Sequence, residues 1–175
     1  SKGQLFFISD KTGYWNIYYL KDKNIFPCHK LSADFGRPFW VFGNSNYDFL
    51  SEEKIACIYT MKGLDQLEII DLKQKKIDKI SLPFTSLSYL KACENTLFFI
   101  ASSPTQAKCL ISYDFKKMKT LCKSSKVSIE SSYISIPEAI EFPTEDNKTS
   151  HGFFYPPKNR DQFGEGKPPL IIKSH

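Results

Sequence analysis

Side chains that could carry out chemistry are few in this 175-residue sequence, and they are widely spaced. Five cysteines and three histidines are present, but there is no Cys-x-x-Cys pair and no Cys/His set with zinc spacing. Cys28 and His29 are adjacent, which is poor geometry for two ligands of one metal ion. Neither a phosphate-binding loop nor a dinucleotide fingerprint is present. The sequence therefore predicts no metal site and no cofactor.

A hydrolytic serine is the next chemistry to consider. The Gly-x-Ser-x-Gly elbow that presents such a serine in many hydrolases is absent from the sequence. A catalytic triad needs a nucleophile hydrogen-bonded to a base, and a third group that holds the base. The candidates do not supply that set, so the sequence predicts no catalytic residue among Ser9, Ser150, His29 and His151.

The cysteines indicate a compartment rather than a reaction. An odd number at irregular spacing is typical of reduced thiols in a cytosolic protein, so we expect a cytoplasmic location. Cys57 and Cys109 lie inside apolar runs and are interpreted as buried small hydrophobic residues. None of the five has the Lys- and His-rich surroundings that favour a reactive thiolate.

Composition favours strands and excludes several classes of protein. Aromatic residues make up 15% of the chain, which favours strands and disfavours a helix bundle, a coiled coil or a collagen-like fibre. The net charge is +5, but the lysines are scattered, so no nucleic-acid partner is predicted. No apolar stretch approaches the ~18 residues of a membrane span, and no signal peptide precedes the first strand pattern, so we expect no membrane partner.

A repeat of short strands organises most of the chain. Apolar runs that begin at Leu5, Ile55 and Leu97 are each followed by a turn, a second run, another turn and a third run. Two of these copies are preceded by a further run, at residues 47–50 and 87–91. Four short strands in a unit of roughly 40–50 residues are typical of a β-propeller blade.

For residues 1–125 the repeat therefore predicts a mostly β fold, a partial β-propeller of about three four-stranded antiparallel blades. The first unit lacks its leading strand, and a propeller typically needs at least ~4 blades to close. We expect the chain to be cut from something longer. Uncovered blade edges in such a stack would favour self-association.

The pattern changes after residue 125. Residues 126–175 are predicted to begin with a Ser-rich linker, followed by a half-buried strand over 134–143 and a returning strand over 150–156. A polar loop over 157–167 follows. Residues 168–175 are then predicted to form a strand that enters the core of a second domain.

Four segments in register resemble one known family. Residues 8–18 and 35–43 are similar to the "SDRTGWWNLY" and "FGxPxWxxG" motifs of the prolyl oligopeptidase family, in its acylaminoacyl-peptidase and dipeptidyl-peptidase-like branch. Residues 138–157 resemble the hairpin that opens the hydrolase domain of these enzymes. Residues 167–175 resemble the strand that leads into their His-Gly-Gly-Pro loop.

The resemblance implies a function for the longer protein. It implies an N-terminal β-propeller that restricts access to short peptides, and a C-terminal α/β-hydrolase domain with a Ser-Asp-His triad. Residues 126–175 would be the first strands of that domain, and the triad would follow His175. His175 would be the first residue of the oxyanion-side loop. The fragment alone is expected to be inactive.

Three residues in the connection between the first two blades are candidates for contact with peptide substrates. They are Arg37, Phe39 and Trp40, and their structural alternative is a plain connection between blades. A second function also stays open at this point, a β-propeller scaffold that binds peptide or protein without catalysis.

Overall fold

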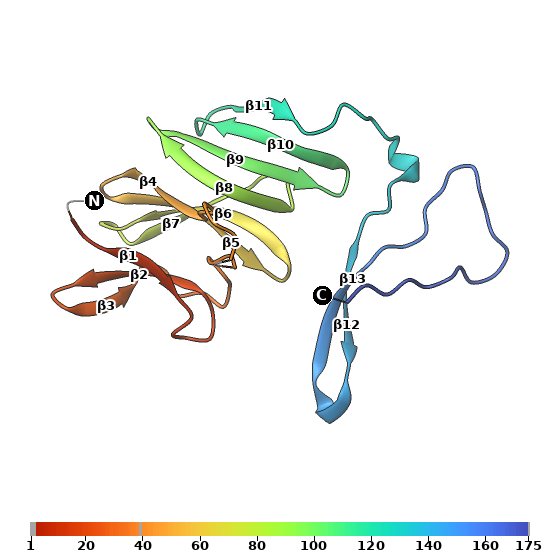
Figure 1. Ribbon diagram of the computed structural model, residues 1–175, viewed down its shortest axis with the longest axis horizontal. Coiled ribbons are helices and arrows are strands. Elements are labelled where there is room, and N and C mark those ends of the chain that lie inside the picture. The colour runs from red at the N-terminus through yellow and green to blue at the C-terminus, as the bar shows by residue number, and fades with distance from the viewer. Residues whose placement is uncertain (1–2, 39, 175) are drawn as a thin grey trace. The chain divides into compact units, whose positions relative to one another are not determined.

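A computed structural model describes residues 3–38 and 40–174, and almost all of its regular structure is antiparallel strand. The chain divides into two compact units, Ser1–Ser125 and Lys126–His175. The first unit holds three sheets and the second holds one hairpin (Figure 1). The mostly β, antiparallel fold predicted from the sequence is confirmed.

Sheet A is the first sheet along the chain and has three strands. They are β1 (Phe6–Ser9), β2 (Asn16–Lys21) and β3 (Asn24–Pro27), in the order β1-β2-β3. A two-residue turn joins β2 to β3, and both of its residues have positive φ, 49° at Asp22 and 63° at Lys23. Positive φ at both positions is the geometry of a type I′ hairpin, whose twist matches that of the strands.

Sheet B is four-stranded and follows the same plan. Its strands are β4 (Tyr47–Ser51), β5 (Lys54–Met61), β6 (Leu64–Asp71) and β7 (Lys76–Ile80), in chain order. The turn between β5 and β6 again has two residues with positive φ, and its second residue is Gly63. In β6 the side chains alternate between the two faces of a buried sheet.

Sheet C repeats the four-stranded plan with β8 (Ser86–Cys93), β9 (Thr96–Ser103), β10 (Gln106–Tyr113) and β11 (Met118–Lys123). Its first strand is irregular. The register against β9 shifts between Ser88 and Lys91, and Tyr89 has a φ of 55°. Two residues of β8 therefore oppose one residue of β9, which is a β-bulge.

The three sheets confirm the repeat read from the sequence. The runs that begin at Leu5, Ile55 and Leu97 contain the second strand of each unit, and sheet A lacks the leading strand that sheets B and C possess. The leading strands β4 and β8 lie side by side. The sheets are compatible with propeller blades, and the number of blades in the protein stays a prediction.

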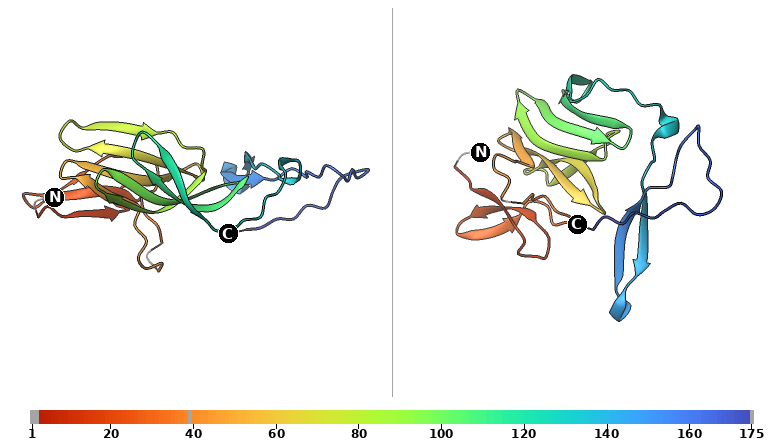
Figure 2. Two further views of the ribbon diagram at one scale, coloured as in Figure 1. Left: turned by 90° about the horizontal axis from the view of Figure 1, so that it is seen from above. Right: turned by 45° about the vertical axis from the view of Figure 1, so that its right-hand side comes forward.

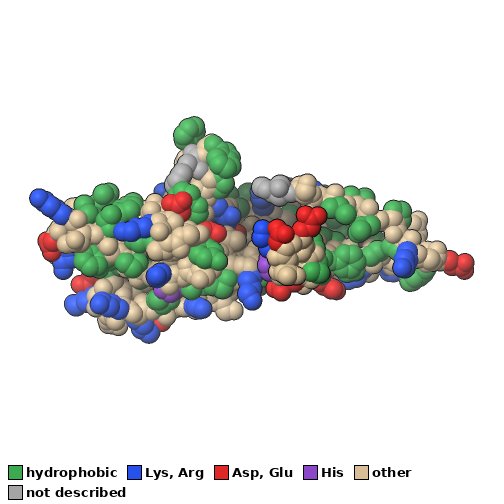
Figure 3. Space-filling model, turned by 90° about the horizontal axis from the view of Figure 1, so that it is seen from below, with side chains coloured by type: hydrophobic (Ala, Val, Ile, Leu, Met, Phe, Trp, Pro, Cys, Tyr) green, Lys and Arg blue, Asp and Glu red, His purple; other side chains and the backbone are tan. Residues whose placement is uncertain are grey.

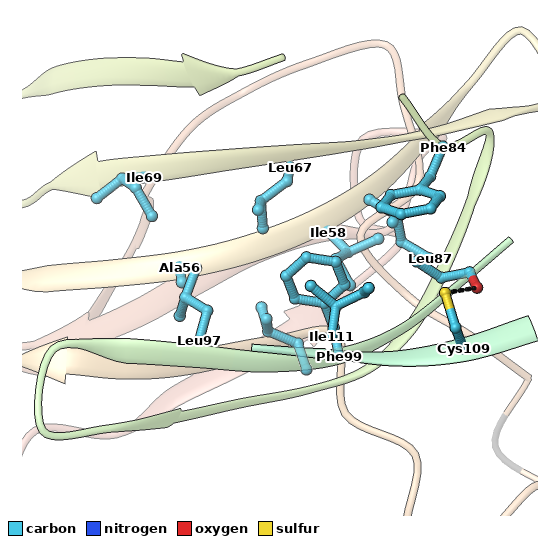
Figure 4. Packing of buried hydrophobic residues seen from close by; sticks show 12 residues of the cluster. Ala56, Ile58, Leu67, Ile69, Phe84, Leu87, Leu97, Phe99, Cys109 and Ile111 are labelled. Carbon is cyan, nitrogen blue, oxygen red and sulfur yellow. Dashed lines mark hydrogen bonds between the residues drawn. The ribbon is translucent and has the colours of Figure 1, made fainter. Parts of the chain in front are cut away.

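Two hydrophobic cores hold the sheets together. Between sheets B and C, buried aliphatic side chains of β5 and β6 pack against Phe99, Ile111 and their neighbours on sheet C (Figure 4). Between sheets A and B, Ile17 packs with Phe35, Tyr59 and Ile70. Figure 2 shows the sheets stacked face to face from two further directions. The middle sheet is thus buried on both faces, which explains the continuous apolar run Ile55–Tyr59 of β5.

The second unit is open and contains little secondary structure. It comprises the short 3₁₀ helices η1 (Ser131–Tyr133) and η2 (Glu145–Asn147), and a hairpin of β12 (Glu138–Pro143) and β13 (Thr149–Phe154). The hairpin falls where the sequence predicts two strands. The first of them was expected to be half-buried, but every residue of β12 is exposed.

The strand predicted at residues 168–175 is wrong over its described part. Residues 168–174 form no strand, and Leu170, Ile171 and Ile172 are exposed. An apolar run becomes a strand only when another strand pairs with it, and the described residues offer it none. Position 175 lies outside the described residues. Among the residues described here, no helix has the length and apolar character that crossing a membrane requires.

Candidate functional site

Three of the candidate residues predicted from the sequence, Arg37, Phe39 and Trp40, fall on the long connection between β3 (Asn24–Pro27) and β4 (Tyr47–Ser51). Arg37 and Trp40 are described by the structure, whereas Phe39 and His175 lie outside the described residues. The roles of Arg37, Phe39 and Trp40 as substrate contacts, and of His175 at the edge of the oxyanion-side loop, therefore stay predictions. The structure does show what holds the connection in place and which of its side chains face solvent.

The start of the connection is fastened to sheets A and B by backbone hydrogen bonds. The backbone N–H groups of Asp34 and Thr60 donate to each other's carbonyl oxygens at 3.0 and 2.8 Å. The N–H of Phe35 donates to the carbonyl of Trp15 at 2.7 Å. The next residue must be glycine, because a Cβ at Gly36 would lie 2.9 Å from the Cβ of Trp15.

Arg37 is held by a buried carboxylate. Its Nη2 donates to Asp65 Oδ2 at 2.8 Å and to the carbonyl oxygen of Leu87 at 3.1 Å. Asp65 also accepts the backbone N–H of Leu87 at 2.8 Å and the hydroxyl of Thr60 at 2.6 Å. Both carboxylate oxygens are thus used. The cluster ties the connection to the first residues of β6 and β8.

The tip of the connection is apolar and faces solvent. Trp40 is 80% exposed and Phe42 is 92% exposed, with Val41 between them. The N–H of Val41 donates to the carbonyl of Pro38 at 3.2 Å, which forms a turn. The tip thus exposes three consecutive apolar side chains to solvent. We name residues 40–42 the exposed tip.

A second polar cluster lies between sheets A and B. Glu68, in the middle of β6, is fully buried, and its Oε1 lies 2.7 Å from Nδ1 of His29. The thiol of Cys57 lies 3.9 Å from the same oxygen. Glu68 Oε2 has no hydrogen-bond partner among the described residues. The buried carboxyl group is therefore only half satisfied.

The thiols near this cluster are held in their neutral form. Burial raises the pKa of Cys28 from 9.0 to about 12. Burial, followed by the charge of Glu68, raises the pKa of Cys57 well above its ordinary value. The interpretation of Cys57 and Cys109 as buried small hydrophobic residues is confirmed. A thiol that keeps its proton is a poor nucleophile and a poor metal ligand, so this cluster is structural.

Neither a charged patch on the face in Figure 3 nor a metal-binding group among the described residues marks a further site. Lys and Arg side chains are scattered over the face shown in Figure 3 and do not gather into one patch. Within residues 3–38 and 40–174, no group of three or more His, Cys, Asp or Glu residues is arranged to hold a metal ion. In the second unit, His151 pairs at 3.5 Å with Glu141 across the hairpin, and both are exposed.

Sequence reasoning missed the partners that position the site. Asp65 follows a Lys-Gly turn at the start of a strand, and this is the one local feature of the sequence that marks its position. Its ion pair with Arg37 joins residues 28 positions apart, which the sequence does not indicate. Asn16 is fully buried, and its amide exchanges hydrogen bonds with the backbone of Leu31 at 2.9 and 3.1 Å. Such long-range pairs leave no periodic trace in a single sequence.

Comparisons with known proteins come from structure alone. No protein-family model matches the chain, and no curated protein matches it in sequence. A puromycin-hydrolysing peptidase of Mycobacterium tuberculosis matches with a TM-score of 0.86 at 22% identity, over 94% of this chain and 26% of that one. A puromycin hydrolase matches with a TM-score of 0.81 at 23% identity, over 91% of this chain and 25% of that one.

A more distant match extends the group. Prolyl oligopeptidase B from Galerina marginata has a TM-score of 0.65 at 11% identity, over 87% of this chain and 22% of that chain. The chain therefore spans about a quarter of the length of the structures it matches. At these identities the likeness establishes a shared fold. The resemblance to prolyl oligopeptidases indicated by the sequence motifs is confirmed at that level.

Proposed function

We propose that this chain is a non-catalytic segment of a serine peptidase of the prolyl oligopeptidase family. Residues 1–125 would be blades from the C-terminal end of its β-propeller, and residues 126–175 the linker and first strands of its α/β-hydrolase domain. The observation that carries the proposal is the fold shared with a peptidase over 94% of the chain, which includes parts of both compact units.

The chemistry belongs to the longer protein. It would hydrolyse short peptides through an acyl-enzyme on a serine, with a histidine as base and an aspartate that orients the histidine. These three residues would lie in the rest of the hydrolase domain, because no Gly-x-Ser-x-Gly elbow is present in this sequence. His175 would stand at the edge of the loop that stabilises the oxyanion.

The connection between β3 and β4 would contact peptide substrates and so restrict their access. Arg37, through its bond to Asp65, would fix the base of the connection. Phe39, Trp40 and the rest of the exposed tip would contact the peptide. The high exposure of Trp40 and Phe42 supports this role, because apolar side chains in water gain free energy when a peptide covers them. The five free cysteines support a cytoplasmic location.

The peptidase proposal is tested by comparing this chain with the longer protein that contains it. We expect the longer protein to react with a fluorophosphonate probe and to hydrolyse an aminoacyl p-nitroanilide. We expect the 175-residue chain alone to do neither. A longer protein that fails to label would overturn the peptidase assignment and favour the alternative, a propeller scaffold that binds peptide or protein without catalysis.

The access role is tested in the longer protein by Trp40→Ala and Phe42→Ala. We expect each to raise KM for a peptide of several residues and to leave kcat for the small p-nitroanilide unchanged. Leu121→Ala is the matched control, since Leu121 is also exposed but lies on β11. If both tip variants still react with the fluorophosphonate probe and their KM for the peptide is unchanged, the access role is wrong. The peptidase assignment would still stand.

We also propose that the isolated chain self-associates through its uncovered sheets. Apolar side chains are exposed on the first sheet, at Leu20 and Ile25, and on the last, at Leu110 and Leu121. A sheet with an apolar face and a free edge is a template for another chain. Size-exclusion chromatography with light scattering should show oligomers whose mass falls on dilution. A monomer at all concentrations would contradict self-association.

A further inference from the structure

A cavity separates sheets A and B at the end where β1 begins and β6 ends. Its volume is about 730 Å³, which is within the usual range for small-molecule sites. Of the connection between β3 and β4 only its first residue, Cys28, lines the cavity, whereas Arg37 and the exposed tip do not, and the proposed function makes no use of it. One wall belongs to sheet A, and the other to the last residues of β6 and the turn that follows them.

The wall on sheet A is a row of three aromatic rings. The register pairs Phe6 with Tyr19 and Tyr19 with Phe26, so that the three side chains follow one another across the sheet. The ring centroids are 5.8 Å apart in the first pair and 5.6 Å in the second, and the second pair is stacked. Ile70 and Leu72 form the apolar surface on the other wall. This shape suits a flat apolar ring.

The mouth of the cavity is positively charged. Lys21 and Lys75 line it, and neither forms an ion pair with a described residue, whereas the nearby Lys73 and Lys76 pair with Glu53 and Asp78. One acidic residue also lines the cavity. Asp71 is buried, and its Oδ1 is occupied by the backbone N–H groups of Lys73 and Gln74 at 3.0 and 2.7 Å.

We propose that this cavity binds a small aromatic carboxylate. The ring would lie against Tyr19 and Phe26, opposite Leu72, and the carboxylate would face Lys21 and Lys75. The argument is one of complementarity: an aromatic row offers a ring favourable contact, and two unpaired ammonium groups favour one negative charge at the mouth. The neighbouring thiol of Cys28 stays uncharged and does not oppose an anion.

The test compares N-acetyltryptophan with its uncharged amide in titrations of the full 175-residue chain, followed by NMR. We expect N-acetyltryptophan to cause saturable shifts at the amides of Lys21, Phe26 and Leu72, and to bind several-fold more tightly than the amide. Equal binding of the two ligands would overturn the charge argument. Saturable shifts confined to other sheets, or no saturable shifts, would overturn the site.

Two variants separate the charged mouth from the aromatic wall. Lys21→Glu with Lys75→Glu should weaken N-acetyltryptophan by roughly tenfold and leave the amide unchanged. The matched control is Lys62→Glu with Lys108→Glu, two exposed lysines that do not line the cavity. An equal loss in the control would contradict local recognition. Phe26→Leu, at a half-exposed position, should weaken the binding of both ligands. Unchanged binding would show that the aromatic wall does not contact the ligand.

Discussion

Two buried carboxyl groups on one strand show how differently this fold treats acidic side chains. Asp65 and Glu68 are three positions apart on β6, so they point to opposite faces of sheet B. Asp65 faces sheet C and receives hydrogen bonds on both oxygens, from Arg37, Thr60 and Leu87. Glu68 faces sheet A, with His29 and a thiol on one oxygen and no described partner on the other.

The two carboxyl groups therefore differ in their effect on the stability of the fold. A buried carboxylate whose oxygens are fully bonded fixes the groups around it and is expensive to disturb. A buried carboxyl group with an unpartnered oxygen costs free energy that the rest of the core must offset. Asp65 therefore positions the connection between β3 and β4, whereas Glu68 is a weak point between sheets A and B. Four experiments test this contrast.

Asp65→Asn should have the largest effect. The amide replaces one acceptor oxygen with a donor, which then faces donors from the Leu87 backbone or the Thr60 hydroxyl. We expect the free energy of unfolding to fall by about 3 kcal/mol in urea titrations. Asp78→Asn is the control, since its ion pair with Lys76 is exposed and should matter little. A loss below about 1 kcal/mol would refute the structural role of Asp65.

Alkaline pH should weaken the Glu68 side of sheet B next. Burial raises the pKa of Cys28 from 9.0 to about 12, so the folded chain keeps a proton that the unfolded chain releases. The stability from this thiol is fully present below pH 9 and is lost as pH rises towards 12, by about 3 kcal/mol at pH 11.

Urea titrations from pH 8 to pH 11 measure this loss. Cys28→Ala should flatten the alkaline decline, whereas Cys122→Ala, at an exposed thiol, should leave its slope unchanged. The same decline in the Cys28 variant as in the native sequence would show that other groups cause it. Cys57 also contributes in the same direction, because its pKa is raised by burial too.

Arg37→Met should cost less than the loss of Asp65. The methionine keeps much of the apolar stem, and the carboxylate keeps its donors from Thr60 and Leu87. We expect a loss of about 1–2 kcal/mol, because the ion pair is only partly screened by water. Lys76→Met, which removes an exposed ion pair, is the control. An effect no larger than that of the control would show that Arg37 is not an anchor.

Glu68→Gln should have the smallest effect. The amide oxygen can still bond to His29, and the change removes a carboxyl group that is poorly satisfied. We expect the free energy of unfolding to change by less than about 1 kcal/mol in either direction. The labelling rate of Cys57 by a thiol reagent should also stay low, since the thiol is fully buried. A loss as large as that of Asp65→Asn would erase the contrast between the two groups.

The sequence allowed the sheets to be predicted but not the contacts that position the site. Alternating apolar runs and two-residue turns are local signals, and β5, β6, β9 and β10 appear where those signals predict them. The pair of Arg37 and Asp65 and the pair of His29 and Glu68 join residues 28 and 39 positions apart. Which carboxyl group meets which cation depends on how the sheets stack, and composition cannot encode that.

The prediction for residues 168–175 failed over its described part for a related reason. The run Leu170-Ile171-Ile172 has a strand's composition, but a strand is defined by the hydrogen bonds of its neighbour. The strands β12 and β13 pair with each other, so they form where they were predicted, although β12 is exposed and not half-buried.

The bulge in β8 has a consequence for how this strand can vary in length. Leu87 and Leu90 are three positions apart, yet both are buried in the core between sheets B and C. Removing Tyr89 would restore strict alternation, with Leu87, Leu90 and Ala92 still inward and the pairing with β9 unbroken. A deletion of one residue ordinarily turns the rest of a strand over. In β8 we expect that a one-residue deletion at position 89 is tolerated, whereas one in β6, which pairs with β5 and β7 without a register shift, is not.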